Sequence, residues 1–395
     1  MLNNKTKIMK MKYLFVFAVV VATALNSCSK DEVFLDKTDG TQMKFGLYSS
    51  QIVSKAGDVT SETIKTTGFG VFANYSAGGG NFSNSSSLMN YMYNQEITWS
   101  GTDWIYAPVK YWSNNPEDTY SFFAYAPYTD VDATPAATSG ITAFSSAQIE
   151  GAPVASYTMP ANMNDAVDFV AGQLMNTPEV PLVSLNMKHQ LTKVGFSVKT
   201  NIPATTNKEE NQTWVVVREL TVGGSLIMKD GTYIFSSLST TDEDRTNHQQ
   251  DGIWFIDTPI DLTFVLDGEA VPAELSGITD YTAQMNYFQN GTNNLKSIGV
   301  GYILPPNGTV GVTTAGDVTA KITYDIVTLD SNLDGGYTVA KQEDVALDLG
   351  GATSAATLKQ GFAYNFIITI SLSECVISGN VVGWDSATDS NVEVD

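Results

Sequence analysis

The stretch "GFAYNFIITISL", residues 361–372, carries the clearest signal of secondary structure in the chain. Its large apolar side chains fall on every second residue, at Phe362, Tyr364, Phe366, Ile368, Ile370 and Leu372. Because successive side chains of a β-strand point to opposite faces, this period predicts a strand with one buried face. The other face is mostly small or polar, with Ile367 as the exception.

Apolar runs of similar length precede this stretch, among them "YSFFAYAP", "TWVVVRELTV", "VGYILPP" and "AKITYDIVTLD". No helical pattern lies between them, and charged residues make up only 16% of the chain. Many short strands without intervening helices favour antiparallel sandwiches over a parallel sheet. We therefore expect an all-β protein built from antiparallel β-sandwiches.

Two places in this pattern predict local irregularities. In "VPLVSLNMKHQLTKVGFSVKT", residues 180–200, the apolar set lies on odd numbers up to Leu191 and on even numbers from Val194. A change of parity requires an extra residue, so we expect a bulge or kink near Thr192 and Lys193. In "SLIMKDGTYIF", residues 225–235, the pair Asp230-Gly231 predicts the tight turn of a hairpin.

The polar stretch at residues 201–212 contains a proline and is the expected boundary between two domains. The chain has 395 residues, which is long enough for two domains of ordinary size. We expect a leader at residues 1–27, an N-terminal domain at 28–205 and a C-terminal domain at 206–395.

The first 27 residues read as a secretory signal. Four lysines and no acid precede an uncharged apolar run at residues 13–25, which is too short to span a bilayer comfortably. The sequence Leu25-Asn26-Ser27-Cys28 resembles the lipobox of bacterial lipoproteins. The resemblance implies cleavage before Cys28, acylation of its thiol (palmitate) and amine, and a lipid anchor. The alternative is an ordinary signal with an incidental cysteine.

The next residues, "SKDE" at 29–32, resemble the acidic tag that sends some lipoproteins to the outer face of the outer membrane. The expected location is therefore the cell surface, with the protein anchored in the outer membrane or carried on a fimbrium.

Charge and cysteine content exclude several classes of function. The formal net charge is −21, and loss of the four leader lysines lowers it to −25. The phosphates of nucleic acids repel such an acidic chain, so we expect no nucleic-acid partner. Once Cys28 is acylated, Cys375 is the remaining thiol, which leaves neither an intrachain disulfide nor a cysteine-based metal cluster. Cys375 is expected to be a small buried residue.

The sequence contains no recognisable arrangement of catalytic residues. His189 lies on the apolar face of a predicted strand and His248 in a polar loop, so we interpret His189 as a core or bulge histidine; a catalytic role is the alternative. The stretch "DSNLDGG", residues 330–336, matches the first half of a calcium loop, but Lys341 stands where such a loop needs glutamate. A turn between strands explains the same residues.

Acidic residues also stand near tryptophans, an arrangement that suits sugar hydrolysis as well as ordinary turns and cores: Glu96, Asp103, Glu117 and Asp118 among Trp99, Trp104 and Trp112. With 42 acids in the chain such neighbours arise by chance. We expect no enzyme activity, no cofactor and no metal site.

A family resemblance enters at "WSGTDWIYAPVKYWSNNPEDTYSFFAYAP", residues 99–127. Its spacing of Trp, Tyr-Trp and Phe-Phe-Ala-Tyr-Ala-Pro resembles the fimbrillin-like family, the type V pilins and related surface lipoproteins. Three further stretches agree in order: "VSLNMKHQLTKVGFSV", "GYILPP" and "LKQGFAYNFIITISLSECVISGNVVGW". The resemblance implies two tandem transthyretin-like β-sandwich domains. It also implies export as a lipoprotein.

The resemblance implies a mode of assembly as well. A surface protease removes the first strand, and a strand from a neighbouring subunit fills the groove. On this chain the removable strand corresponds to residues 41–49 and the cut to Lys55-Ala56 in "IVSKAGDV", with Lys65 as a second candidate. The family often has Arg where Lys55 stands, and a solvated loop lysine is the alternative interpretation. The donor strand corresponds to residues 379–395, "GNVVGWDSATDSNVEVD".

Three hypotheses follow. The first is a pilus (fimbrial) subunit or tip adhesin that joins other pilin subunits by strand exchange. The second is a surface lipoprotein that never polymerises and binds a glycan or host protein through its loops. The third is a surface enzyme, which the two unclustered histidines disfavour. A cut in the loop after the first strand distinguishes the first hypothesis from the second.

Overall fold

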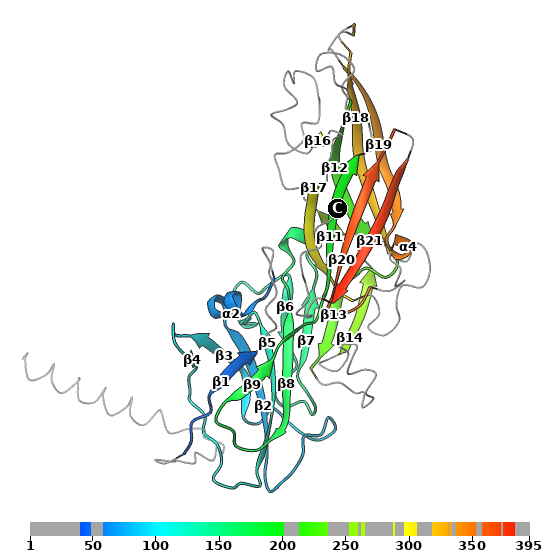
Figure 1. Ribbon diagram of the computed structural model, residues 1–395. Helices are drawn as coiled ribbons and strands as arrows, with labels where there is room; N and C mark the ends of the chain where they lie inside the picture. Colours follow the sequence, from blue (N-terminus) through cyan, green and yellow to red (C-terminus); the bar gives the residue numbers. More distant parts are fainter. Residues whose placement is uncertain are drawn as a thin grey trace, which may run out of the picture. The chain divides into compact units, whose positions relative to one another are not determined.

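The computed structural model describes residues 40–48, 58–200, 213–235, 253–259, 262–264, 287–288, 296–305, 318–330, 332–333, 337–352, 358–372 and 374–383. The regular secondary structure of these residues is almost entirely β-strand, joined by turns and loops (Figure 1). The helices among them are α2 (Ser61–Thr67), α4 (Leu349–Ala352) and the 3₁₀ turn η1 (Met163–Asp165). Within the described ranges, no helix has the length and apolar character needed to cross a membrane.

A six-stranded antiparallel sheet separates two cores. Its order is β10-β8-β5-β2-β3-β4. Alternate residues of its central strands enter different cores: Phe72 and Phe123 one, Val71 and Phe122 the other. This sheet comprises β2 (Phe69–Ser76), β3 (Met92–Trp99), β4 (Trp104–Ile105), β5 (Thr119–Ala126), β8 (Val170–Thr177) and β10 (Lys188–His189).

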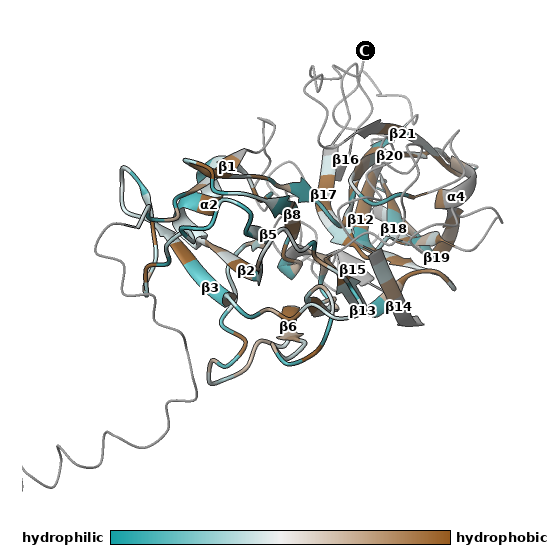
Figure 2. Cartoon of the chain, turned by 90° about the horizontal axis from the view of Figure 1, so that it is seen from below, coloured by the Kyte–Doolittle hydropathy of each residue, from teal (hydrophilic) through white to brown (hydrophobic). Residues whose placement is uncertain are grey.

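The outer strand β3 shows the hydropathy pattern expected near a sheet edge. Met92 and Ile97 are buried, whereas Tyr93 and Glu96 are exposed. Teal and brown segments accordingly follow one another along β3 in Figure 2. This strand is buried on one face only, unlike β5, whose residues are buried on both.

A second antiparallel sheet has the order β14-β13-β7-β6: β6 (Gly140–Phe144), β7 (Val154–Thr158), β13 (Met228–Ile234) and β14 (Ile253–Pro259). The hairpin turn predicted at Asp230-Gly231 is wrong, because both residues lie inside β13. A Cβ atom on Gly231 would lie 2.9 Å from Cε3 of Trp254. The glycine therefore allows an indole ring to approach the sheet rather than allowing the chain to turn.

A third sheet has the order β17-β11-β20-β21: β11 (Thr192–Thr200), β17 (Lys296–Ile303), β20 (Phe362–Ile370) and β21 (Cys375–Gly383). The strand predicted from residues 361–372 is confirmed as β20, with Tyr364, Phe366, Ile368 and Ile370 buried. Leu372 was expected on that face, but it lies in the turn after the strand and is 67% exposed. Strands β11 and β20 run parallel, contrary to a purely antiparallel sandwich.

The fourth sheet has the order β15-β12-β18-β19, with β16 beside β12: β12 (Thr213–Gly223), β15 (Leu262–Phe264), β16 (Tyr287–Phe288), β18 (Thr319–Leu329) and β19 (Tyr337–Asp348). The pairing of Leu329 with Tyr337 makes residues 330–336 the connection of a hairpin. The amide of Leu333 donates to the carbonyl oxygen of Asp330 at 3.1 Å, which agrees with the interpretation of "DSNLDGG" as a turn; Ser331 and residues 334–336 lie outside the described residues.

Residues 183–200 pass through three sheets in succession. They form β9 (Val183–Asn186), which pairs with β1 (Phe45–Tyr48), then β10, which pairs with β8, then β11. The predicted irregularity near Thr192 and Lys193 is therefore not a bulge but a break just before them. The strand is interrupted at Gln190 and Leu191, where the chain leaves one sheet and enters another, and the change of sheet reverses the parity of the buried residues.

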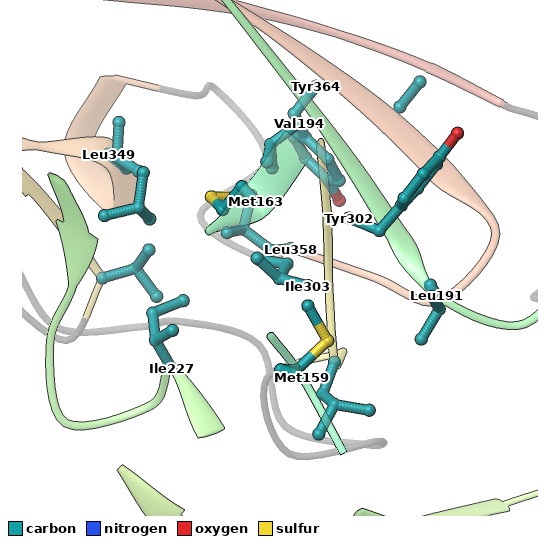
Figure 3. Close-up of a cluster of buried hydrophobic side chains, with 14 of the residues drawn as sticks. Met159, Met163, Leu191, Val194, Ile227, Tyr302, Ile303, Leu349, Leu358 and Tyr364 are labelled. Carbon is teal, nitrogen blue, oxygen red and sulfur yellow. The ribbon is translucent and has the colours of Figure 1, made fainter. Parts of the chain in front are cut away.

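The larger core gathers apolar side chains from many strands and loops. Figure 3 shows a part of it, in which Met163 comes from η1, Leu358 from the segment before β20 and Ile303 from β17. A Cβ atom on Gly301 would lie 2.9 Å from Cε of Met163, so this methionine packs directly on β17. The expected domain boundary at 205/206 lies outside the described residues. The sheets join strands from both sides of it, and the two-domain, transthyretin-like division stays a prediction.

Candidate assembly site at the first strand

The first described strand is held between two segments that are distant in sequence. Strand β1 pairs in parallel with β9, with Phe45 opposite Val183. The amide of Val183 donates to the carbonyl oxygen of Lys44 at 2.8 Å, and the amide of Met43 donates to the carbonyl oxygen of Lys110 at 2.9 Å. The predicted removable strand, residues 41–49, thus contains a real strand, although Ser49 lies outside the described residues.

Alternate side chains of this segment enter the smaller core. Met43 is 0% exposed and Phe45 is 3% exposed, Leu47 is partly buried, and Lys44 faces solvent. The Phe45 ring meets the rings of Tyr106 and Phe122 edge to face, with centroids 5.4 and 5.8 Å apart. We call the site that these inward side chains fill the β1 groove. Tyr106 and Phe122 contact Phe45 there, Val183 and Leu185 lie opposite Phe45 and Leu47 on β9, and Trp112 belongs to the same core.

Tyr106 forms hydrogen bonds with the backbone of the segment that leads into β1. Its hydroxyl has one proton, for which the carbonyl oxygens of Met43 at 3.0 Å and of Lys110 at 3.3 Å are both within reach, and it accepts from the amide of Lys110 at 3.2 Å. Burial raises the pKa of Tyr106 to about 12. The phenol therefore stays protonated, and able to donate, at any pH near neutrality.

A glycine on the neighbouring strand fixes how closely β9 approaches the large sheet. A Cβ atom on Gly172 of β8 would overlap the carbonyl oxygen of Asn186 of β9, and a backbone oxygen cannot rotate away. We predict that Gly172→Ala lowers the free energy of unfolding by about 1–3 kcal/mol. Chemical denaturation measures this. Ser184→Ala, at an exposed position of β9, is the matched control and should stay within about 0.5 kcal/mol.

Beyond residues 49–57 the described chain resumes at a buried cluster of charged side chains. Asp58 is 4% exposed; its Oδ2 lies 2.6 Å from Nζ of Lys193, and its Oδ1 accepts a 2.7 Å bond from the Tyr302 hydroxyl. The amide of Val59 donates to Oδ2 of Asp168 at 2.7 Å. We call these groups the Asp58 cluster; they are Asp58, Asp168, His189, Lys193 and Tyr302.

The histidine singled out in the sequence belongs to this cluster. His189 is 5% exposed, and its Nδ1 lies 2.9 Å from Oδ2 of Asp168. Burial, together with the charges of Asp168 and Asp58, raises the pKa of Tyr302, so its phenol remains a donor. The interpretation of His189 as a core histidine is confirmed. Its partners were missed, because nothing near it in sequence marks them.

Helix α2 follows the cluster directly. Thr60 caps it: the amide of Thr63 donates to Oγ1 of Thr60 at 3.2 Å, while the amide of Thr60 donates to Oγ1 of Thr63 at 2.6 Å. Lys65, the second candidate for the cut, lies in this helix. Its Nζ is 2.8 Å from Oε1 of Glu62 and 5.4 Å from the Trp99 ring centroid. A protease requires an extended segment, so a helical residue is a poorer substrate.

The acids that stand near tryptophans have ordinary surroundings. Asp118 is buried and accepts bonds from the Tyr75 hydroxyl, the Gly78 amide and the Asn115 side chain at 2.7, 2.9 and 2.8 Å. Burial raises the pKa of Asp118, but these hydrogen bonds and one from Ser113 outweigh it, so the pKa is lowered. Glu96, Asp103 and Glu117 are exposed. Among the described residues, no group of three His, Cys, Asp or Glu is placed to hold a metal ion.

Cys375 begins β21 and is half-buried. Burial raises the pKa of its thiol to about 11, so at pH 8 the thiolate is roughly 100-fold scarcer than for an ordinary cysteine. We predict correspondingly slow alkylation by iodoacetamide, with a rate that still rises with pH above 9. A rate at pH 8 equal to that of a free cysteine peptide would contradict this.

Cys28, Lys55, Ala56 and His248 lie outside the described residues.

Comparison with known proteins agrees with this architecture. The family model described as fimbrillin-like matches residues 58–384. The curated fimbrium subunit Fim1C of Phocaeicola vulgatus is 24% identical over 391 residues, covering 95% of this chain and 98% of that protein. A fimbrial protein of Bacteroides vulgatus has a similar fold, with a TM-score of 0.66, 22% identity, and coverage of 87% of this chain and 99% of its own.

The family match spans most of the chain and includes the sequence stretches that first indicated it. The curated relative is a fimbrium subunit and the structural neighbour a fimbrial protein. The chain belongs to the fimbrillin-like family.

Proposed function

We propose that this protein is a fimbrial subunit that is exported as a lipoprotein, loses its first strand by proteolysis and receives a strand from another subunit in its place. The observation that carries the proposal is the position of Met43 and Phe45. Both are buried in a core that the rest of the protein builds, yet they belong to a short segment ahead of the candidate cut.

Loss of this segment would create a strong driving force for refilling. Exposure of the β1 groove removes the burial of two large side chains, each worth about 1.5–3 kcal/mol. It also leaves unpaired the amide of Val183 and the carbonyl oxygen of Lys110, which now bond to Lys44 and Met43. A strand from elsewhere restores both kinds of interaction together.

The Asp58 cluster supports a cut at Lys55 in particular. Cleavage there gives a new N-terminus at Ala56, two residues before Asp58. Asp58 and Val59 are bonded to Lys193, Tyr302 and Asp168, none of which lies in the released segment. The remaining protein therefore keeps a fixed N-terminal end when β1 departs. The family match also begins at residue 58.

The lipid anchor completes the proposal. Acylated Cys28 lies on the N-terminal side of Lys55, so the same cut that frees the β1 groove also releases the subunit from the outer membrane. Anchoring and assembly are then mutually exclusive states of one molecule, which keeps assembly at the cell surface.

The test is the N-terminus of the protein in surface material sheared from a bacterium that assembles fibres of this family. We expect the unaltered chain to begin at Ala56 and to occur in high-mass material that resists mild denaturation. Lys55→Gln should instead begin at Cys28 and stay monomeric in the membrane fraction, whereas Lys65→Gln, the matched control, should behave like the unaltered chain. Monomers of all three that begin at Cys28 would overturn the proposal and leave a surface protein that binds a glycan or host protein.

A further inference from the structure

We infer that the β1 groove selects a partner strand with two large apolar side chains at alternate positions, and rejects residues 384–395 of a second copy. This inference rests on the proposed strand exchange and specifies its partner. It is carried by the shape of the groove and by the composition of the residues that follow β21.

The β1 groove has two deep positions and one shallow one. Met43 and Phe45 fill the deep positions and are 0% and 3% exposed, and Leu47 fills the shallow one. The position of Phe45 is lined by aromatic rings, since those of Tyr106 and Phe122 both contact the Phe45 ring. An occupant therefore needs a side chain of methionine size followed, two residues later, by one of phenylalanine size.

The position between the second and third side chains is also restricted. A Cβ atom on Gly46 would lie 2.9 Å from Cδ2 of Leu182 and 3.3 Å from its Cγ. Leu182 is 48% exposed and its side chain can shift, so this position disfavours a long side chain without forbidding it. A glycine or another small residue fits here with the least displacement.

Residues 384–395, "WDSATDSNVEVD", do not meet these requirements. Their alternating apolar pair is Val392 and Val394, and valine is smaller than either side chain of β1. With Val392 in the place of Met43, Val394 takes the place of Phe45 and leaves much of the aromatic pocket empty. The opposite strand direction exchanges the two valines and leaves the same space.

A shift by two residues fits worse. With Val392 in the place of Phe45, Ser390 enters the fully buried place of Met43 and Glu393 takes the place of Gly46 beside Leu182. The hydroxyl of Ser390 would then be buried among apolar side chains, which is unfavourable. Trp384 offers no better match, because it would bring Ser386 into the neighbouring deep position. Val382, two residues earlier, lies in β21 and is already paired with Ala363 of β20.

Exchange of synthetic strands into the cleaved protein tests the inference. The chain from residue 28 carries Cys28→Ser and a site-specific protease sequence in place of residues 53–57, and is cut there. Three labelled peptides are then titrated: residues 41–49 (TQMKFGLYS), residues 387–395 (ATDSNVEVD), and the second peptide with Val392→Met and Val394→Phe. The third peptide has the same length and charge as the second and so isolates side-chain size.

We expect the peptide of residues 41–49 to enter the groove and displace the released segment. The peptide of residues 387–395 should bind on the order of 100-fold more weakly, because about four buried carbons are lost, and the V392M/V394F peptide should recover most of that difference. Equal binding of peptides 41–49 and 387–395 would overturn the inference while leaving strand exchange intact. Failure of all three to bind would overturn both.

Discussion

Replacing Phe45 with alanine is expected to lower the free energy of unfolding by about 3–5 kcal/mol, the range measured for buried aromatic side chains. The ring is 3% exposed and contacts Tyr106 and Phe122, so its removal leaves a cavity that neighbouring strands cannot close easily. Chemical denaturation of the chain from residue 28 measures the effect. It would show that a segment ahead of the candidate cut is part of the core rather than an appended arm.

The exposed neighbour Lys44 provides the matched control. Lys44→Ala removes a solvent-facing side chain from the same segment and should change the free energy of unfolding by no more than about 0.5 kcal/mol. If Phe45→Ala is as mild as Lys44→Ala, the core does not depend on β1, and no driving force for refilling its groove remains.

Replacing Lys193 with methionine should cost about 3–5 kcal/mol, for an electrostatic reason. The substitution keeps much of the side-chain length but leaves the carboxylate of Asp58, which lies 2.6 Å from Nζ of Lys193, buried without that cation. Denaturation of K193M alone and of D58N/K193M measures the effect. The double variant should regain part of the stability, because the neutral amide costs less to bury than a carboxylate.

The control for this pair is the surface ion pair of helix α2. Lys65 and Glu62 lie 2.8 Å apart, but their side chains are 37% and 78% exposed, so water screens them. Lys65→Met should therefore change stability by less than about 1 kcal/mol. An equally small effect of Lys193→Met would show that the Asp58 cluster does not hold the end of the chain that cleavage creates.

The features that were predicted correctly from the sequence are those that depend on a local pattern of residues. The alternation from Phe362 to Ile370 defines β20 because each residue reports which face is buried, and this information needs no distant partner. The turn at residues 330–336 follows from the same logic, since its glycines and acids separate two apolar runs.

The features that were missed or misjudged depend on contacts between distant residues. Asp230-Gly231 has the composition of a turn, but the approach of Trp254 to Gly231 requires an extended glycine there. The bond between Asp58 and Tyr302 joins residues 244 positions apart, and that between Val59 and Asp168 joins residues 109 apart. No local signal identifies such partners, so this part of the site could be found only from the fold.

The most direct test of the account is to lock β1 in place. Gly46 and Ser184 are paired across β1 and β9, and Ser184 faces solvent, so Gly46→Cys with Ser184→Cys places two thiols at roughly 4.8 Å strand spacing, within reach of a disulfide. The quantity to measure is the fraction of this variant in sheared high-mass surface material, with and without reductant during growth, beside the single variant Gly46→Cys. The account predicts that the locked strand abolishes incorporation and that reductant restores it to the level of Gly46→Cys. Equal incorporation of the locked and reduced forms would show that β1 does not leave, and would contradict the account.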